Sequence, residues 1–457
     1  MDILTLLISR VNDVLWTYIL IIMLLGCAFW FTFKTNFVQF RMIREMIRLL
    51  GDSTGKTEGR EHHISSFQAF AVSIASRVGT GNLAGVATAI TLGGPGAVFW
   101  MWVIALLGAS SAFIESTLAQ LYKVHGHNSF VGGPAYYMKK GLKQPWMGVL
   151  FAFLLIFTFG FAFNSVQSNT ICAAFEEAFN IPPSLMGVIL TSLTLIIIFG
   201  GIQRIAKVSS IIVPVMALGY IFLSLFIVIV NAKHLPEVIE LIIANAFGLE
   251  QALSGGIGMA LMQGIKRGLF SNEAGMGSTP HAHALANVKC PHDQGVVAMI
   301  GVFIDTFVVL TLNALVIIST LYTEGGPLHE CGAAAASTTL GKANLAQTAF
   351  GVVFGETAGN MFVAVCLFFF AFSTILGWNL FGKINVAYLF GKKSVIVYTI
   401  LALIFIFLGT MMANDLVWEL SDMFNNLMVI PNVIALFALT NLVVKHADDP
   451  NRIPGKK

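Results

Sequence analysis

The sequence predicts an all-α integral membrane protein with about eleven transmembrane helices. Of the 457 residues, 56% are hydrophobic and 11% are charged, whereas a soluble domain carries about 25% charged residues. The chain also contains many uncharged apolar runs, and a helix of about 20 such residues spans a bilayer. Two of these runs are interrupted by glycine-rich polar segments, at residues 76–82 and 270–277.

The apolar runs define the expected spans in order. They lie near residues 12–34, 65–90, 97–122, 146–178, 184–200, 208–231, 248–286, 295–322, 355–380, 395–411 and 415–444. Because the first run lacks a basic n-region and a clear cleavage pattern, we interpret it as a retained span. Runs 146–178, 248–286 and 415–444 exceed one simple crossing, so tilt, overhang or a break must absorb the excess.

Two segments outside the runs also predict helices. Residues 35–50 alternate apolar and basic side chains, which is typical of an amphipathic helix on the membrane surface. Residues 330–352 are rich in Ala, Ser, Thr and Gly and predict a short external helix.

The basic residues predict the orientation. If residues 35–64 face the cytoplasm, most of the 26 Lys and Arg residues lie on that side or at its span ends, and the opposite side holds Arg10, Lys233 and Lys342. This positive-inside bias places the N-terminus outside the cell and the C-terminus in the cytoplasm. We expect a multi-pass protein of the plasma membrane, the inner or cell membrane of a prokaryote.

The interrupted spans are the second and the seventh, five spans apart. Spans 2–6 and 7–11 therefore form two sets of five that cross the membrane in opposite directions, the pattern of an inverted repeat. We divide the chain into residues 1–64, with the extra first span and the surface helix, residues 65–231, the first repeat, and residues 232–457, the second.

The interruptions indicate function. A broken helix is tolerated in hydrocarbon only where protein or a ligand satisfies the freed backbone groups, and secondary transporters bind solute and ion at such breaks. A glycine packing face is the alternative, but Arg77 suits neither packing nor lipid.

Other functions lack their signatures. No basic cluster indicates nucleic acid, the five scattered cysteines form no CxxC pair, and no catalytic constellation or nucleotide-binding motif occurs. We therefore expect neither an enzyme nor a cofactor.

Motifs along nearly the whole chain resemble the alanine or glycine:cation symporter family (sodium:alanine symporters). They are SRVGTGN at 76–82, GGPGAVFWMW at 93–102, GGP at 132–134, QSN at 167–169, RGLFSNEAGMG at 267–277, FIDT at 303–306, FSTILGW at 372–378, NLM at 426–428 and IPN at 430–432. The resemblance implies the LeuT-type fold, sodium coupling and a small neutral amino acid such as alanine or glycine.

The same resemblance implies a sodium site. Backbone carbonyls of Ala75, Val78 and Phe370 and the hydroxyls of Ser373 and Thr374 would form a neutral shell of five oxygens. Interhelical hydrogen bonding is the alternative role for the two hydroxyls.

The expected substrate site adjoins it. Backbone N–H groups at Thr80 and Gly81 suit a carboxylate at a half-helix N-terminus. By resemblance, Asn272 and the backbone beside it face the substrate ammonium group, and Phe270 forms an apolar wall. Gln167 is an amide at mid-membrane depth that can hydrogen-bond the substrate, and Trp378 would close the pocket beside a small side chain. For Gln167 and Trp378, ordinary packing is the alternative.

Buried charges should pair with one another. The charges within the spans are Arg77, Lys266, Arg267 and Glu273. Arg77 and Arg267 are candidate gate or scaffold cations, with Glu273 as the expected partner, and a purely structural pair is the alternative to a role in transport. For Glu115 and Asp305 we favour structural hydrogen bonding over a proton relay.

The predicted function is secondary active transport: sodium-coupled symport of alanine, glycine or D-alanine into the cell by alternating access. A proton-coupled amino-acid transporter is the first alternative, and a channel is the second. The expected partners are the amino acid, sodium ion and the lipid bilayer, without nucleic acid, and the oligomeric state stays open.

Overall fold

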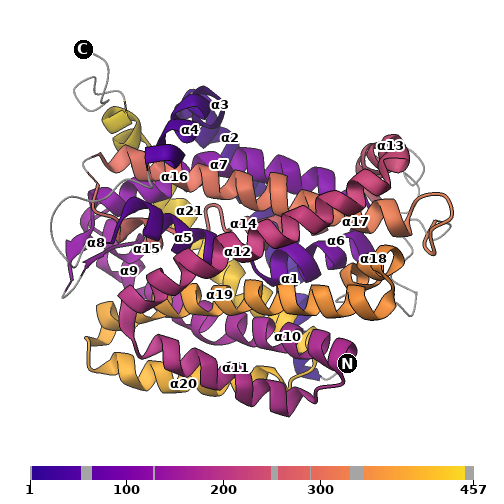
Figure 1. Cartoon of the computed structure of the whole chain (residues 1–457). Coiled ribbons are helices and arrows are strands. Elements are labelled where there is room, and N and C mark those ends of the chain that lie inside the picture. The colour runs from indigo at the N-terminus through magenta and orange to yellow at the C-terminus, as the bar shows by residue number, and fades with distance from the viewer. Residues whose placement is uncertain are drawn as a thin grey trace.

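The structure is a computed structural model that describes residues 3–52, 64–126, 129–248, 256–288, 290–329 and 344–447. Nearly all of these residues lie in helices (Figure 1). A small antiparallel hairpin joins strands β1 (Val124–His125) and β2 (Phe130–Val131). The all-α class is confirmed.

Each predicted apolar run is mainly helical over the residues that the structure describes. The spans are α1 (Ile3–Val14) continued by η1 (Leu15–Leu20) and α2 (Ile21–Lys34); α5 (Ser66–Arg77), η2 (Gly81–Gly85) and α6 (Val86–Gly93); α7 (Ala97–Leu121); α9 (Pro145–Phe157), η3 (Thr158–Ala162) and α10 (Phe163–Phe179); α11 (Pro183–Ile198); α12 (Gly201–Val230); α14 (Gly256–Asn272) and α15 (Pro280–Ala284); α16 (Pro291–Phe303), η5 (Ile304–Leu310) and α17 (Thr311–Leu321); α19 (Glu356–Phe390); α20 (Ser394–Gly409); and α21 (Asn414–Ala447).

The three overlong runs resolve differently. Residues 145–179 form one continuous helix whose middle, η3, has the wider π-helical turn, and α21 continues through Pro431. The described part of the run 248–286 is instead two helices, α14 and α15, with irregular backbone between them. Of the three overlong runs, only residues 248–286 absorb the extra length with a break in the helix.

The bundle has two distinct ends. Helix α1 begins at the end that carries α13 (Leu235–Ala246) and α18 (Leu345–Phe354), and we call this end the N-side (Figure 1). Helix α21 finishes at the opposite end, the C-side, beside α8 (Pro134–Lys140) and α15. The sequence did not predict α13, and residues 330–343 of the expected external helix lie outside the described residues.

The C-side halves of the two broken helices are joined. Ile64, just before α5, forms a parallel bridge with Ala286, just after α15, and the Asn287 N–H donates to the Ile64 carbonyl at 3.2 Å. Lys123 Nζ donates to the Ala286 carbonyl at 2.7 Å, and burial lowers the pKa of this ammonium group to about 8. The two half-helices therefore share one anchored end.

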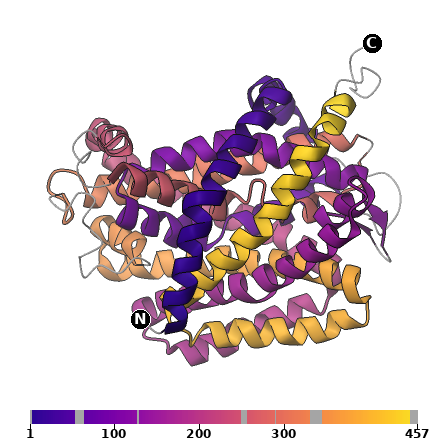
Figure 2. The same cartoon turned by 180° about the vertical axis from the view of Figure 1, so that it is seen from behind.

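The first span packs beside the last (Figure 2). Asn12 Nδ2 donates to the backbone carbonyl of Glu419 at 2.9 Å and to its Oε2 at 2.6 Å, while Asn426 Nδ2 donates to Asn12 Oδ1 at 3.1 Å. The helix that lies outside the repeat is thus tied to one side of α21.

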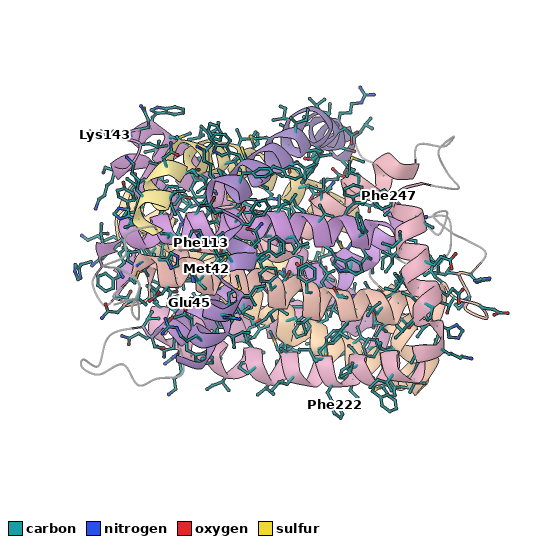
Figure 3. All side chains as sticks on the ribbon, turned by 90° about the horizontal axis from the view of Figure 1, so that it is seen from above. Met42, Glu45, Phe113, Lys143, Phe222 and Phe247 are labelled. Carbon is teal, nitrogen blue, oxygen red and sulfur yellow. The ribbon has the colours of Figure 1, made fainter. Side chains whose placement is uncertain are left out.

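The outer surface of the bundle is apolar, as a bilayer requires. Phe222, which is 73% exposed, projects from the edge of α12 in the view from above (Figure 3). By length and composition, six helical segments of the described chain are each apolar enough to cross a membrane: Ala97–Leu121, Pro145–Phe179, Gly201–Val230, Pro291–Leu321, Glu356–Phe390 and Asn414–His446.

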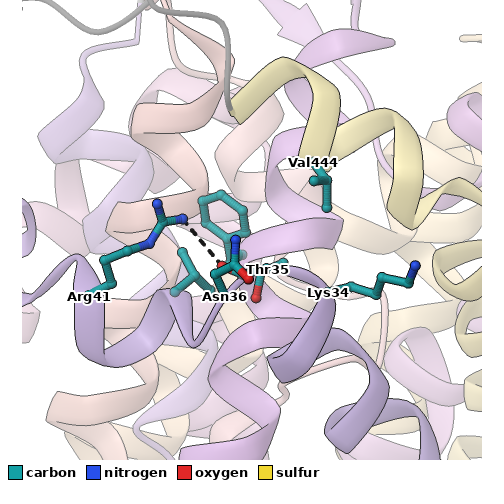
Figure 4. A pocket seen from close by; sticks show the side chains of 7 residues that line it. Lys34, Thr35, Asn36, Arg41 and Val444 are labelled. Atoms are coloured by element: carbon teal, nitrogen blue, oxygen red, sulfur yellow. Dashed lines mark hydrogen bonds between the residues drawn. The ribbon is translucent and has the colours of Figure 1, made fainter.

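The expected surface helix follows α2 in two pieces, α3 (Val38–Arg41) and α4 (Ile43–Asp52). The turn between α2 and α3 places Asn36 and Phe37 at positive φ. A small pocket opens beside this turn, where Arg41 Nη2 donates to the Thr35 carbonyl at 3.3 Å (Figure 4).

Candidate functional site

The first break separates α5 from η2 at residues 78–80. Val78 leaves helical geometry, with φ −78° and ψ 88°, and the chain is helical again from Gly81. Asn82 Oδ1 accepts a hydrogen bond from the Gly79 N–H at 3.1 Å, so a side chain replaces the lost helical partner. The whole break is buried.

The second break follows Asn272. Glu273, Gly275 and Gly277 all have positive φ, at 52°, 81° and 85°; glycine adopts this region without a Cβ penalty, but glutamate does not. Asn272 Oδ1 accepts from the Ala274 N–H at 3.0 Å and so ends α14.

Glu115 on α7 holds the second break. Its Oε1 accepts from the Gly275 N–H at 3.2 Å, and its Oε2 accepts from the Gly277 N–H at 3.1 Å and from Asn432 Nδ2 at 3.2 Å. This is the hydrogen bonding that we favoured for Glu115 over a proton relay. The carboxylate needs only acceptor oxygens here, since every partner donates.

We therefore expect Glu115→Gln to destabilise the fold by about 3 kcal/mol, because the new NH₂ group faces a donor and leaves it unpaired. Thermal unfolding of the purified protein in detergent measures this. Glu177→Gln, at an exposed position near the end of α10, is the matched control and should unfold like the unchanged protein. Equal stability of the two variants would contradict the role of Glu115.

The two breaks touch each other. A Cβ placed on Gly81 would lie 3.0 Å from Ser271 Cα and 3.2 Å from Phe270 Cδ1. Ser76 Oγ, at the end of α5, donates to Glu273 Oε2 at 3.2 Å. Ser76 and Glu273 are 197 positions apart in the sequence, so the fold brings distant segments into contact at the two breaks.

The structure brings four of the five expected sodium ligands together. Thr374 Oγ1 on α19 lies 2.8 Å from the Ala75 carbonyl, 3.2 Å from that of Val78 and 2.8 Å from that of Phe370. The fifth, Ser373 Oγ, contacts this group only through the Phe370 carbonyl, to which it donates at 2.9 Å, and it lies 3.8 Å from Met216 Sδ.

This oxygen cluster suits a cation. One hydroxyl has one proton to donate, so Thr374 cannot satisfy three carbonyls at once. Carbonyl oxygens at the C-terminal end of a half-helix such as α5 are the groups that coordinate sodium in transporters built on broken helices.

Gln167 on α10 faces the first break. Its Oε1 accepts from the Thr80 N–H at 3.3 Å. Within the described chain, Gln167 Nε2 and Thr80 Oγ1 are buried side-chain atoms that have no hydrogen-bond partner. Buried polar groups are normally paired, so these two atoms mark a place where a polar ligand would bind.

Aromatic rings line the second break. The Phe270 ring centroid lies 4.9 Å from that of Phe163 and 6.3 Å from that of Trp378. Trp378 Nε1 donates to Glu273 Oε1 at 2.6 Å, which fixes the indole ring. Asn272 does not join this group: its amide contacts in the described chain are Ala274 and, at 3.5 Å, Thr306 Oγ1.

The expected pairing of Glu273 with the buried cations is wrong. The positive φ of Glu273 turns its carboxylate toward Trp378 and Ser278, and Ser278 Oγ donates to Oε2 at 2.6 Å. Arg77 donates to the Ala298 carbonyl at 3.0 Å and to Thr279 Oγ1 at 3.1 Å.

The other two cations pair with Asp422 on α21, which the sequence analysis missed. Arg267 Nη1 and Nη2 lie 3.2 and 3.1 Å from the two Asp422 oxygens, and Lys266 Nζ lies 2.6 Å from Oδ2. An acidic residue within the last apolar run was the signal available in the sequence.

Asp305 on η5 contacts both breaks. It accepts from Asn82 Nδ2 at 2.7 Å, from Ser271 Oγ at 3.0 Å and from Thr306 Oγ1 at 3.1 Å. For Asp305 the sequence favours structural hydrogen bonding over a proton relay, and these contacts are hydrogen bonds of that kind.

Comparisons with known proteins give consistent matches. The profile of the sodium:alanine symporter family matches residues 1–453. The chain is 46% identical over 442 residues to the probable sodium/glutamine symporter GlnT of Bacillus subtilis, covering 96% of this chain and 89% of that protein. It is 38% identical over 454 residues to the sodium/alanine symporter AgcS of Methanococcus maripaludis, covering 98% and 97%.

A solved structure matches the fold. The crystal structure of MhsT in complex with L-phenylalanine aligns with a TM-score of 0.56 at 14% sequence identity, covering 85% of this chain and 98% of that one. The predicted LeuT-type architecture is thereby confirmed.

Proposed function

Because the chain belongs to the sodium:alanine symporter family, we propose that it carries a small neutral amino acid, alanine or glycine in the L or D form, into the cell with sodium. Sodium-coupled amino-acid symport by a multi-pass membrane protein follows from the family itself. We propose in addition the substrate, the direction of transport and the residues that bind substrate and sodium. We also propose that the protein lies in the cell membrane with its N-side facing the outside.

The main observation is the juxtaposition at the first break. The unpaired atoms Thr80 Oγ1 and Gln167 Nε2 are both donors that a substrate carboxylate accepts from. The carbonyls of Ala75 and Val78 lie on the other side of the same break, at Thr374. Amino acid and sodium would therefore bind within a few residues of each other.

The surroundings favour a small side chain. Phe270, Phe163 and Trp378 pack close to the break, with ring centroids 4.8 to 6.3 Å apart. Substrate would contact Phe270 and Trp378 with its side chain and Thr80, Gly81 and Gln167 with its polar end. Asn272 keeps only an indirect role in this proposal, since its side chain closes the end of α14.

Transport into sealed vesicles tests the proposal. Purified protein should accumulate labelled alanine when a sodium gradient is imposed, and an imposed proton gradient alone should not replace it. Unlabelled glycine and D-alanine should compete, whereas stronger competition by glutamine would reassign the substrate. Equilibration without accumulation would indicate a channel.

Gln167→Ala should weaken alanine binding roughly ten-fold or more, because a lost hydrogen bond in a buried site costs about 1–3 kcal/mol. Equilibrium binding of labelled alanine measures it. Gln347→Ala removes another buried amide, on α18, and should leave the affinity unchanged. If both variants bind normally, Gln167 is a packing residue.

A further inference from the structure

The small pocket beside the turn after α2 lies on the C-side of the bundle (Figure 4). Four helices and the turn contribute to its wall, through Lys34 of α2, Asn36 of the turn, Arg41 of α3, Phe113 of α7 and Val444 of α21. It encloses about 10 Å³, which is close to the space that one water molecule needs. A ligand can therefore place a single oxygen atom in the pocket, and the rest of that ligand must lie outside, on the surface of the protein.

The wall of this pocket is basic. Lys34 and Arg41 are both exposed, and the described lining contains no acidic residue. Within the described chain, neither cation forms an ion pair with a carboxylate. Arg41 Nη2 donates to the Thr35 carbonyl at 3.3 Å, which fixes the guanidinium group beside the pocket. Because a guanidinium group has five N–H donors, most of them remain available to an anion.

An exposed aromatic surface adjoins the pocket at Lys34. Lys34 Nζ lies 4.7 Å from the ring centroid of Trp30, which is about one turn earlier on α2. The Trp30 ring in turn lies 5.4 Å from that of Phe437 on α21, between centroids. Trp30 is 40% exposed and Phe437 is 50% exposed. Exposed rings on two neighbouring spans suit lipid acyl chains, and tryptophan and lysine are typical of the boundary between hydrocarbon and headgroups.

The surface helix continues this combination of charge and apolar surface. On α4, Ile43 and Ile47 are 48% and 70% exposed, and the exposed Arg44 lies between them in sequence. Arg48 of the same helix binds Glu45, with Nε 3.0 Å from Oε2, so part of the positive charge of α4 is neutralised within the helix. Exposed apolar and basic residues in one segment are typical of a helix that lies among the headgroups of anionic lipids.

We propose that the pocket and the surface formed by Trp30 and Phe437 bind one anionic phospholipid. One phosphate oxygen occupies the pocket and accepts hydrogen bonds from Arg41, whose planar fork of donors fits a phosphate group. Lys34 supplies a second positive charge, and the acyl chains lie along the two aromatic rings.

The chemistry of the site selects this ligand over two related ones. A free phosphate ion would leave the aromatic surface uncovered, and a zwitterionic phospholipid would bring its own ammonium group to a site that already holds two cations without carboxylate partners. Since the lining residues belong to four helices, a bound lipid also links the first span and the surface helix to the last span. The site is separate from both helix breaks, so this inference does not depend on the proposed function.

Lipid binding to the purified full chain tests the proposal without a transport assay. Delipidated protein in detergent is titrated with phosphatidylglycerol, and native mass spectrometry measures the dissociation constant of the tightest-bound molecule. The double variant Lys34→Gln, Arg41→Gln should weaken this binding about ten-fold or more, because the two cations that attract the anionic headgroup are lost. Phosphatidylcholine should bind weakly to the unchanged protein and to the variant alike.

A matched control removes the same two charges elsewhere. Arg204 and Lys207 are exposed residues of α12, and Arg204 Nη1 donates to the Ile196 carbonyl at 3.0 Å, much as Arg41 donates to that of Thr35. The double variant Arg204→Gln, Lys207→Gln should therefore bind phosphatidylglycerol like the unchanged protein.

Two further variants separate charge from apolar contact. Arg41→Lys keeps the positive charge and should retain most of the affinity, whereas Trp30→Ala keeps both cations and should weaken binding by a smaller factor than the double variant at Lys34 and Arg41. Thermal unfolding in the same detergent shows that each variant is folded. Equal phosphatidylglycerol binding by the unchanged protein and that double variant, equal affinity for phosphatidylcholine, or displacement of the lipid by millimolar inorganic phosphate would overturn the assignment.

Discussion

Gly81→Val is expected to abolish sodium-driven alanine uptake while the protein still reaches the membrane. A Cβ at this position would lie 3.0 Å from Ser271 Cα and 3.3 Å from Ser271 Cβ, which is closer than packed carbon atoms normally approach. Valine adds two further methyl groups, so the two breaks must separate. Gly81 would then no longer adjoin Phe270, and the substrate would lose one wall of its site.

A graded series distinguishes this effect from general damage. Gly81→Ala should retain reduced uptake, because the neighbour must yield only a few tenths of an ångström. Gly85→Ala is the matched control in the same helical segment: its Cβ would meet only the Thr80 carbonyl, at 3.7 Å, so uptake should be normal. Normal uptake by Gly81→Val would show that the breaks need not stay in contact.

The substrate carboxylate can be tested without changing the protein. The Gly79 and Thr80 N–H groups already have side-chain partners, Asn82 and Gln167. The carboxylate would therefore displace Gln167 Oε1 or bind Thr80 Oγ1 and Gln167 Nε2. Alaninamide should fail to compete with alanine, since donors at a half-helix N-terminus favour an anion. Equal competition by the two compounds would place the carboxylate elsewhere.

Thr374→Ala should raise the sodium concentration for half-maximal uptake by about ten-fold or more, since one lost ligand costs roughly 1–3 kcal/mol. The variant keeps the three carbonyls but removes the hydroxyl oxygen that lies within 3.2 Å of each of them. Sodium dependence of alanine uptake in vesicles measures the change. Binding of sodium and alanine is coupled reciprocally, so the alanine affinity at low sodium should fall as well.

Two control variants show whether the effect of Thr374→Ala is due to the lost hydroxyl group at this position. Thr374→Ser keeps the hydroxyl and should retain most of the sodium affinity. Thr194→Ala removes a buried threonine hydroxyl that bonds only within its own helix, to the Leu190 carbonyl at 2.8 Å, and should leave sodium dependence unchanged. An unaltered sodium response in Thr374→Ala would remove this residue from the sodium site.

Sequence reasoning predicted the spans and the two breaks because their causes are local. About 20 apolar residues in a row need no partner to identify them, and the glycines of residues 79–81 and 275–277 interrupt a helix wherever it packs. The surface helix and the positive-inside pattern are local in the same sense. The site residues were reached only through the family resemblance, and their roles stay predictions.

By itself, then, the sequence determined that this chain is a helical membrane protein with broken second and seventh spans arranged as an inverted repeat. The tertiary structure decided which polar groups meet. Arg267 and Asp422 are 155 positions apart, Trp378 and Glu273 are 105 apart, and Thr80 and Gln167 are 87 apart. Hydropathy and helical period place a residue on a helix but do not select the neighbouring helix that its side chain contacts. That choice depends on how all the spans pack, and it is why Glu273, the nearest acidic residue in the sequence, proved not to be the partner of Arg267.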